Sequence, residues 1–389
     1  MDTKKNIYIM YAAALLQGMC FYGPIATLYR RAQGVSVFQI TLIESIYLLL
    51  CLALEIPWGI IADRIGYKKT MFFCNGLYFI SKIVFWQANG FWWFLLERVM
   101  LSIVTAGISG VDTSILYLSC EKGKSQRVFG VYNSLGMVGL LAASVIFSVF
   151  VGENYKLSGF LTVISYGLAA LLSLFLAEVK KTEHQKVVMI EFKILLKRIL
   201  KKKYLMLLLV AFAFFAETHQ TLTVFLSQLQ YEKSGMSASA IGYVFMLITL
   251  AGMCSICSDR MTKRVGMKRM GLFLYGMVII ACVGLAFAEK AIFTILGILT
   301  IRISHELFLP LQTELQNRQV QTENRATEIS IYAMVIDVVS AGVSLIFGFL
   351  AGIDLGLAFF FGAGLCLAGA VLFFTWYEKA AGRTGQSIF

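Results

Sequence analysis

Charged and histidine side chains stand inside long apolar stretches of this sequence. An acidic or basic side chain at the centre of a bilayer costs about 2.5–3.5 kcal/mol, so each one needs a partner, water or a function. Side chains of this kind can hold a charged solute or pass protons across a membrane. The candidates for proton coupling or substrate binding are Glu55, Asp112, Glu217, Asp337, Arg98, Arg302, His219, His305 and Glu306.

Two acids of the first half of the chain are separated in depth from the nearby bases. We place Glu55 and Asp112 in the inner half of the membrane, and Lys82 and Arg98 in the outer half. One of the two acids is therefore expected to stay protonated or to titrate during turnover. Glu44 falls at the depth of Lys82, and these two residues are expected to form a structural ion pair.

The second half of the chain gathers charge near the middle of the membrane. Arg302 could neutralise Glu217 or Asp337, which would leave the other acid as a proton carrier or as a site for a substrate cation. His219 and His305 titrate near neutral pH and could relay protons. A hydrogen-bonded packing role is the alternative for each histidine.

The composition indicates which elements must position these side chains. Of the 389 residues, 59% are hydrophobic and only 14% are charged, whereas a soluble domain carries about 25% charge. A soluble enzyme is excluded, because this composition cannot form a globule with a polar surface. A membrane-spanning helix needs about 20 apolar residues, and the apolar runs predict twelve such spans. The predicted spans are 7–29, 37–62, 70–88, 91–118, 128–151, 157–177, 204–229, 237–257, 270–288, 291–317, 327–350 and 355–377.

Basic residues are distributed unevenly around these spans. Most of the 34 Lys and Arg residues fall on one side of the membrane, which the positive-inside rule assigns to the cytoplasm together with both termini. The net charge of +12 is thus explained by topology, and no nucleic-acid partner is expected. The predicted location is the cell membrane, with the chain as a multi-pass protein of the lipid bilayer.

The longest polar stretch divides the chain into halves. Its apolar residues recur at helical spacing, which is typical of an amphipathic helix on the inner membrane face, although its polar start could equally be a solvated linker. The expected domains are an N-terminal six-helix bundle at 1–178, a cytoplasmic linker with this helix at 179–203, and a C-terminal six-helix bundle with a short cytoplasmic tail at 204–389.

An internal repeat supports two related bundles. Arg64–Lys69 (Arg-Ile-Gly-Tyr-Lys-Lys) follows the second predicted span, and Arg264–Arg269 (Arg-Val-Gly-Met-Lys-Arg) follows the eighth. Arg98 and Arg302 occupy corresponding places in the fourth and tenth spans. Repeats related by an axis along the membrane normal are one architecture of secondary transporters.

The segment Gly59–Lys69 resembles the loop 2–3 signature of the major facilitator superfamily, G-x-x-A-D-R-x-G-R-[RK]. Tyr67 replaces the usual Arg, and Lys263 takes the Asp position in the second copy. The resemblance implies an all-α polytopic membrane protein, with twelve transmembrane helices in two six-helix bundles related by pseudo-two-fold symmetry. It also implies a gating role for the loop, whose motif residues are Gly59, Asp63, Arg64, Gly66, Lys68 and Lys69.

Other patterns bear on the subfamily. Glu55–Gly59 is similar to a helix 2 pattern of drug exporters in this superfamily, and Arg98 followed by Gly107 is loosely similar to a helix 4 signature of proton-coupled members. The fifth span contains glycines but no proline, so the glycine-proline signature typical of antiporters is missing. The resemblance implies a drug/proton-antiporter-like member in which Glu217 and Asp337 face the central cavity.

The leading interpretation is a proton-coupled secondary active transporter that exports amphipathic or cationic small molecules by alternating access. The alternative is an uptake symporter or uniporter for an organic anion, with Arg98 and Arg302 holding its carboxylate or phosphate. A non-transporting polytopic sensor or membrane enzyme is a different class, and an enzyme would need a convergent catalytic set that we do not find. No enzyme activity, cofactor or metal site is expected. The expected partners are a small-molecule substrate and protons, and the expected state is a monomer.

Overall fold

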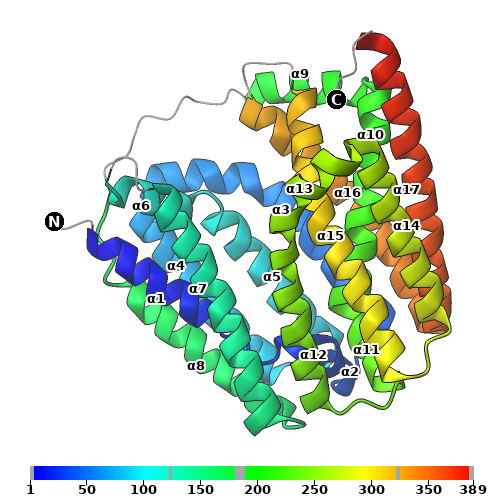
Figure 1. Ribbon diagram of the computed structural model, residues 1–389. Coiled ribbons are helices and arrows are strands. Elements are labelled where there is room, and N and C mark those ends of the chain that lie inside the picture. Colours follow the sequence, from blue (N-terminus) through cyan, green and yellow to red (C-terminus); the bar gives the residue numbers. More distant parts are fainter. Residues whose placement is uncertain (1–3, 122–124, 180–188, 321–324, 385–389) are drawn as a thin grey trace. The chain divides into compact units, whose positions relative to one another are not determined.

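The computed structural model describes residues 4–121, 125–179, 189–320 and 325–384, and a few side chains inside helices, that of Asp63 among them, also lie outside the description. All regular structure in these ranges is helical (Figure 1). Within them, eleven continuous stretches are long and apolar enough to cross a membrane. The chain is therefore an all-helical protein built of membrane-spanning elements.

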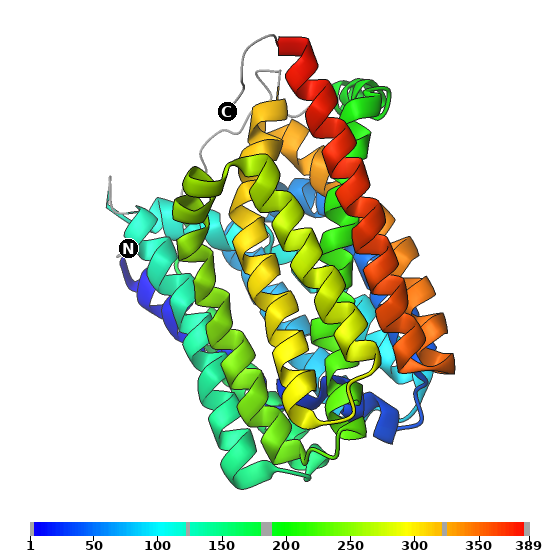
Figure 2. The same ribbon diagram turned by 45° about the vertical axis from the view of Figure 1, so that its right-hand side comes forward.

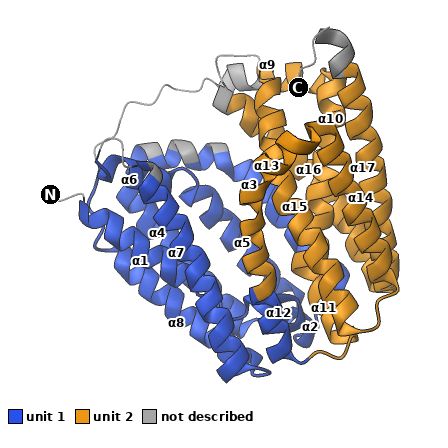
Figure 3. Ribbon diagram, viewed as in Figure 1, with its two compact units in different colours: residues 1–183, 237–246 blue, residues 184–236, 247–389 orange. Residues whose placement is uncertain are grey.

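The chain divides into two compact units, which Figure 3 shows in different colours. Unit 1 comprises residues 1–183 and 237–246, and unit 2 comprises residues 184–236 and 247–389. Ser237–Met246, which consists of Ser237 and the first part of helix α12 (Ala238–Ala251), belongs with unit 1.

Unit 1 is built of the helices from α1 to α8 and the first part of α12. Ser36 begins its longest helix with a capping box, in which the Ser36 hydroxyl and the Gln39 side chain each accept a backbone N–H. Gly66, with φ of 96°, ends the same helix. The elements before α12 are α1 (Lys4–Gly18), η1 (Gly23–Ile25), α2 (Ala26–Ala32), α3 (Val37–Ile65), α4 (Tyr67–Gln87), α5 (Phe91–Ile108), α6 (Val111–Ser119), α7 (Ser125–Ile146), the π-helical η2 (Phe147–Val151) and α8 (Tyr155–Ser173).

Helices α1 and α7 approach each other at backbone distance. A Cβ added at Gly18 would lie 2.1 Å from the carbonyl oxygen of Gly136, and one added at Gly139 would lie 2.1 Å from that of Leu15. Small residues at such crossings allow the close van der Waals packing that holds membrane helices together. Gly136 and Gly139 of the fifth predicted span therefore have a packing role.

Unit 2 has a helical core of its own. Helices α14 and α17 run side by side in both views (Figures 1 and 2), and α10 packs against α17 as well. Its elements are α9 (Met189–Leu200), α10 (Lys203–His219), the π-helical η3 (Gln220–Leu226), α11 (Ser227–Lys233), the end of α12, the 3-10 helix η4 (Gly252–Cys257), α13 (Ser258–Val265), α14 (Met267–Ala286), α15 (Ala291–Gln319), α16 (Arg325–Ile353) and α17 (Leu355–Thr384).

Aromatic rings fill the centre of unit 2. Phe215 is fully buried, with its ring centroid 4.3 Å from that of Phe308 and 4.8 Å from that of Tyr275. Offset and edge-to-face contacts of this kind stabilise a core beyond the apolar area that they bury. This core supports the polar residues that follow Phe215 on α10.

The twelve predicted spans coincide with helical stretches, with one qualification. The predicted span 70–88 is the helix α4. Its 21 residues are not among the eleven stretches that are long and apolar enough to cross a membrane. The predicted amphipathic helix corresponds to α9, where Leu195 and Ile199 are buried while Lys197 and Arg198 are exposed. Residues 180–188 of the polar stretch lie outside the described ranges.

Candidate functional site

Unit 1 holds a cluster of five charged side chains, here called the unit 1 charge cluster, which consists of Arg30, Glu44, Lys82, Glu97 and Arg98. Arg98 Nη2 lies 2.7 Å from Glu44 Oε1, and Arg30 Nη1 lies 3.6 Å from the same oxygen. Lys82 Nζ lies 3.6 Å from Glu97 Oε1, and Arg98 Nε lies 3.6 Å from Glu97 Oε2. Helices α2, α3, α4 and α5 each contribute at least one member.

The structure corrects the expected pairing of Glu44 with Lys82. Glu44 pairs with the two arginines instead, and the acidic partner of Lys82 is Glu97. Helix α5 contributes both an acid, Glu97, and a base, Arg98, to the cluster. Each of the two residues therefore has a nearer partner of opposite charge.

Aromatic faces help to hold the buried cations of this cluster. Lys82 donates a hydrogen bond to the hydroxyl of Tyr22 at 2.9 Å, and its ammonium lies 5.0 Å from the ring centroid of Tyr78 and 5.1 Å from that of Tyr166. The Arg30 guanidinium lies 5.7 Å from the ring centroid of Phe85. Cation–π contacts at such distances stabilise a cation that has lost its water.

Arg30 and Glu97 are the members that the sequence did not reveal as site residues. Arg30 stands beside Arg31 just after the first predicted span, 7–29, yet α2 buries its side chain to 1% exposure. Glu97 immediately precedes Arg98 within the fourth predicted span. That adjacency was an available signal, because an acid beside a base inside a span needs its own partner.

Unit 2 holds a second cluster, here called the histidine cluster, which consists of His219 on α10 and Arg302, His305 and Glu306 on α15. Arg302 Nη2 lies 2.9 Å from Glu306 Oε1, an ion pair between residues one helical turn apart. Arg302 Nη1 lies 3.3 Å from His219 Nε2. His305 Nδ1 lies 3.8 Å from Glu306 Oε1.

The two histidines of this cluster stack face to face. Their ring centroids are 3.7 Å apart and their planes are inclined by 7°. A guanidinium can only donate hydrogen bonds, so the contact with Arg302 requires His219 Nε2 to accept. His219 is therefore the neutral tautomer with its proton on Nδ1 in this arrangement.

The absence of a side chain at Gly252 leaves room for the Arg302 guanidinium. A Cβ at Gly252, the first residue of η4, would lie 3.0 Å from Arg302 Nη2 and 3.8 Å from the Glu306 carboxyl carbon. The missing side chain lets the ion pair between Arg302 and Glu306 sit against the backbone of η4.

The other acids expected to carry protons lie elsewhere. Arg302 pairs with Glu306, so the expectation that it neutralises Glu217 or Asp337 is corrected. Glu217 is buried on α10 and accepts a 2.5 Å hydrogen bond from the Thr221 hydroxyl, while Asp337 is half-buried on α16.

Two further candidates lie outside both clusters. Glu55 on α3 is exposed. Asp112 is half-buried at the start of α6, where its carboxylate accepts the backbone N–H of Thr113 at 2.6 Å. Neither acid has a described ion-pair partner in the unit 1 charge cluster.

The repeated loop has the same local geometry in each unit. Gly66 and Gly266 have φ of 96° and 87°, and each begins the helix that follows. Glu178 accepts the backbone N–H of Lys68 at 3.4 Å in unit 1, and Glu378 forms an ion pair with Lys268 in unit 2. The sequence repeat therefore extends to an acid that closes each loop. The side chain of Asp63, the central residue of the motif, lies outside the described residues.

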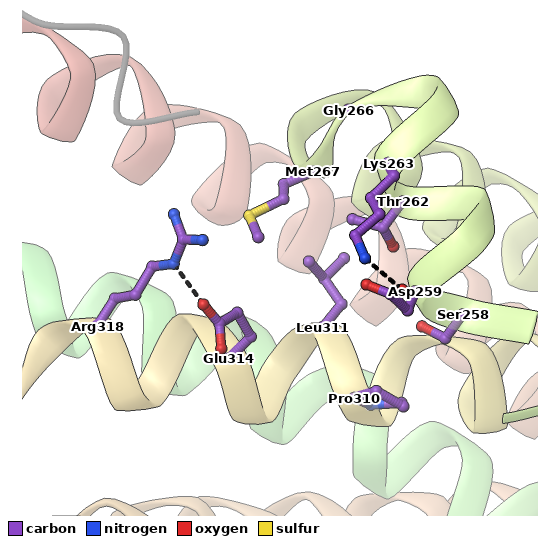
Figure 4. A pocket seen from close by; sticks show the side chains of 10 residues that line it. All are labelled: Ser258, Asp259, Thr262, Lys263, Gly266, Met267, Pro310, Leu311, Glu314 and Arg318. Carbon is purple, nitrogen blue, oxygen red and sulfur yellow. Dashed lines mark hydrogen bonds and ion pairs between the residues drawn. The ribbon is translucent and has the colours of Figure 1, made fainter. Parts of the chain in front are cut away.

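A pocket of about 610 Å³ opens beside the second copy of this loop in unit 2 (Figure 4). Lys263 and Asp259 form one ion pair on its α13 wall, and Arg318 and Glu314 form another on α15. Both pairs join residues of one helix and are largely exposed, so they stabilise the pocket walls only weakly. The pocket contains no member of the histidine cluster.

Helical spans that bury paired charges are typical of membrane proteins that move solutes or ions. Comparison with known families identifies the class. The Major Facilitator Superfamily model matches residues 7–341, so the chain belongs to that superfamily and is a membrane transporter of this type. Among the described residues, no three His, Cys, Asp or Glu side chains are arranged to hold a metal ion.

Solved structures share the fold. The nucleoside transporter NupG superposes with a TM-score of 0.80 at 15% identity, covering 97% of this chain and 100% of its own. A bacterial homologue of the human lysosomal transporter Spinster, inward-facing and unoccupied, gives a TM-score of 0.74 at 16% identity, covering 97% and 96%. At these identities the likeness shows the fold alone.

The curated relatives match a shorter part of this chain. An uncharacterized MFS-type transporter of Methanocaldococcus jannaschii is 24% identical over 139 residues, which is 35% of this chain and 36% of the relative. An uncharacterized transporter of Buchnera aphidicola subsp. Schizaphis graminum is 26% identical over 145 residues, covering 36% and 34%. The chain thus matches about a third of the length of each of these relatives.

Proposed function

We propose that this chain is a proton-coupled secondary transporter of small organic solutes, and that the histidine cluster of unit 2 carries the coupling proton. The observation that supports the proposal is the chain of contacts from His219 through Arg302 to Glu306, with His305 stacked on His219 and facing the same carboxylate. Imidazole changes its charge near neutral pH, which suits it to a pH-driven cycle.

Protonation would exchange the partners within this cluster. With His305 neutral, Glu306 is bonded to Arg302 at 2.9 Å, while His305 Nδ1 remains 3.8 Å from the same oxygen. A proton on His305 turns that contact into a second ion pair that competes with Arg302 for Glu306. Arg302 would then be released toward His219 and the backbone at Gly252, so the proton changes the contact between α15 and η4.

Only some of the groups that face His305 can exchange a proton with it or stabilise its charge. Phe215 of α10 stacks at 6.4 Å and offers no proton, so His219 of the same helix is the titratable neighbour across the contact. The charged neighbours on α15 itself are Arg302 and Glu306. A proton that reaches His305 therefore has a neutral imidazole on one side and a carboxylate on the other.

The gating loop, the topology and the oligomeric state complete the proposal. Gly59, Asp63, Arg64 and the residues after them would latch one conformation of the transport cycle. Both termini would be cytoplasmic in the cell membrane, and the protein would act as a monomer. The excess of acids within the predicted spans, taken alone, would favour export of amphipathic or cationic compounds. An organic anion is favoured instead by the unit 1 charge cluster, where cations outnumber acids.

Reconstituted vesicles test the coupling. Purified protein is placed in liposomes that enclose a pH-sensitive dye, and small organic acids, amines and amides are added in turn without a pH gradient. A coupled transporter changes the internal pH when its solute enters, beyond the leak of protein-free liposomes. Solute entry that moves no protons, and that an imposed pH gradient does not accelerate, would contradict the proposal.

A further inference from the structure

We propose that the unit 1 charge cluster binds the carboxylate of the transported solute, with Arg98 as the residue that contacts it. The proposal deepens the proposed function, on which it rests in taking the bound anion to be part of the transported solute. It names the solute class as an organic anion and assigns its recognition to unit 1.

The first argument is the charge of the cluster. Arg30, Lys82 and Arg98 are three cations, whereas Glu44 and Glu97 are the two carboxylates within ion-pair distance among the described residues. Arg30, Glu44, Lys82 and Glu97 are all less than 9% exposed. A net positive charge at such burial is costly unless an anion joins the cluster.

The second argument is the unused donors. Arg30 is 1% exposed, yet its Nε and Nη1 have no hydrogen-bond partner, and its nearest carboxylate oxygen is 3.6 Å away. Buried donors of a charged group are rarely left without a partner. Glu44 Oε1 and Glu97 Oε2 also lack a hydrogen-bond partner, so the ion pairs of the cluster leave buried donors and buried acceptors unsatisfied.

The third argument identifies Arg98 as the contact residue. Its side chain is 20% exposed, against 1% for Arg30 and 5% for Lys82. Its Nη2 faces Glu44 and its Nε faces Glu97, which leaves Nη1 for another acceptor. Within a membrane the accessible edge of a guanidinium must face water or a ligand rather than lipid.

Glu44 then acts as the internal competitor of the solute. It occupies Arg98 Nη2 at 2.7 Å, and Arg30 is positioned at 3.6 Å to hold Glu44 when a solute carboxylate takes over part of Arg98. A planar carboxylate suits this exchange, because the guanidinium fork binds carboxylates through two parallel N–H donors. Glu44 is thus a positioning residue that tunes the affinity.

The test compares acids with their neutral amides on purified protein, in the absence of any pH gradient. Benzoate, hexanoate and nicotinate are titrated beside benzamide, hexanamide and nicotinamide at constant ionic strength, and binding is read from the rise in melting temperature. At least one carboxylate should stabilise the protein more than its amide does. If no carboxylate exceeds its amide, the proposal is overturned.

Two variants with different expected effects on binding locate the site, with the stabilising carboxylate as the probe. Arg98→Gln should weaken its binding by about 10- to 100-fold, while Glu44→Gln should keep or strengthen it, because a competing anion is removed. Arg31→Gln, which removes an exposed positive charge beside Arg30, is the matched control and should bind normally. Equal losses in Arg98→Gln and Glu44→Gln would mean a structural cluster and would overturn the proposal.

Further measurements keep the result interpretable. If Arg98→Gln does not fold, Arg98→Lys retains the charge but loses the fork and should still show weaker binding. Binding needs no proton movement, so a failure here leaves the coupling proposal standing. Normal carboxylate binding, combined with solute flux that moves no protons, would overturn the coupling proposal but not the proposed carboxylate site.

Discussion

The imidazole rings of His219 and His305 lie parallel, 3.7 Å apart, although the residues come from different helices and are far apart in the sequence. Two stacked imidazoles cannot both be positively charged at low cost, because like charges at this distance repel. Arg302 fixes the first ring as a neutral acceptor, and Glu306 faces the second. A positive charge on both rings at once is therefore disfavoured, and in the proposal above His305 is the ring that takes the coupling proton.

Replacement of Gly252 tests the contact between Arg302 and η4. In Gly252→Ala the new Cβ meets Arg302 Nη2 at 3.0 Å, and the end of a flexible side chain can move aside. We expect proton-coupled uptake to fall several-fold while the melting temperature changes little. Gly276→Ala, where a Cβ would have nothing within 4 Å, is the control for both assays. Unchanged proton-coupled uptake in Gly252→Ala would show that the contact between Arg302 and η4 has no role in coupling.

The pair formed by Lys82 and Glu97 gives a stability test. Glu97→Gln leaves a buried ammonium without its carboxylate, which should lower the free energy of unfolding by about 3–5 kcal/mol. Adding Lys82→Met removes the stranded charge and should recover much of the loss. A double-mutant cycle on thermally unfolded protein in detergent measures the interaction. Additive losses would show that the two residues do not stabilise each other.

The crossing of α1 and α7 gives a packing test. A Cβ at Gly139 would collide with the backbone of Leu15, so Gly139→Ala should destabilise unit 1 by about 1–3 kcal/mol. Gly130→Ala on the same helix, where a Cβ has open space, should be neutral or slightly stabilising. Thermal unfolding in detergent compares the two, and equal stability would contradict the close approach of these helices.

The topology can be tested by labelling. Lys197→Cys on the exposed face of α9 should be protected from an impermeant maleimide added to intact cells, because the polar stretch is expected in the cytoplasm. Lys233→Cys, at the end of α11, is expected outside and should react. The unmodified protein gives the background of its native cysteines. Labelling at position 197 from outside would reverse the orientation.

The sequence predicted the elements well because hydropathy is a property of each segment by itself. The predicted span 291–317 is the helix Ala291–Gln319, and the predicted span 204–229 lies within the helical stretch Lys203–Lys233. The loop motif was equally readable, since the turn at Gly66 depends on neighbours in the chain. Its closing acid Glu178 was not predicted, because it lies more than a hundred residues away.

The pairing of charges could not be predicted in the same way. Depth placed Glu44 beside Lys82, but the partner of an ion pair depends on which helix faces which, and that is set by packing rather than by hydropathy. Arg30 shows the same limit, since only the path of α2 reveals that it is buried while Arg31 is exposed. The candidates Arg98, Arg302, His219, His305 and Glu306 were found because each is a rare residue inside an apolar run.

Gradient-driven accumulation by His305→Gln tests whether His305 carries the coupling proton. A labelled solute that stabilises the purified protein is offered to vesicles containing wild-type or variant protein, with and without a pH gradient. The account predicts that the wild type accumulates solute above its external concentration, whereas His305→Gln does not but still exchanges labelled for unlabelled solute, because exchange needs no net proton movement. Full gradient-driven accumulation by His305→Gln would contradict the account.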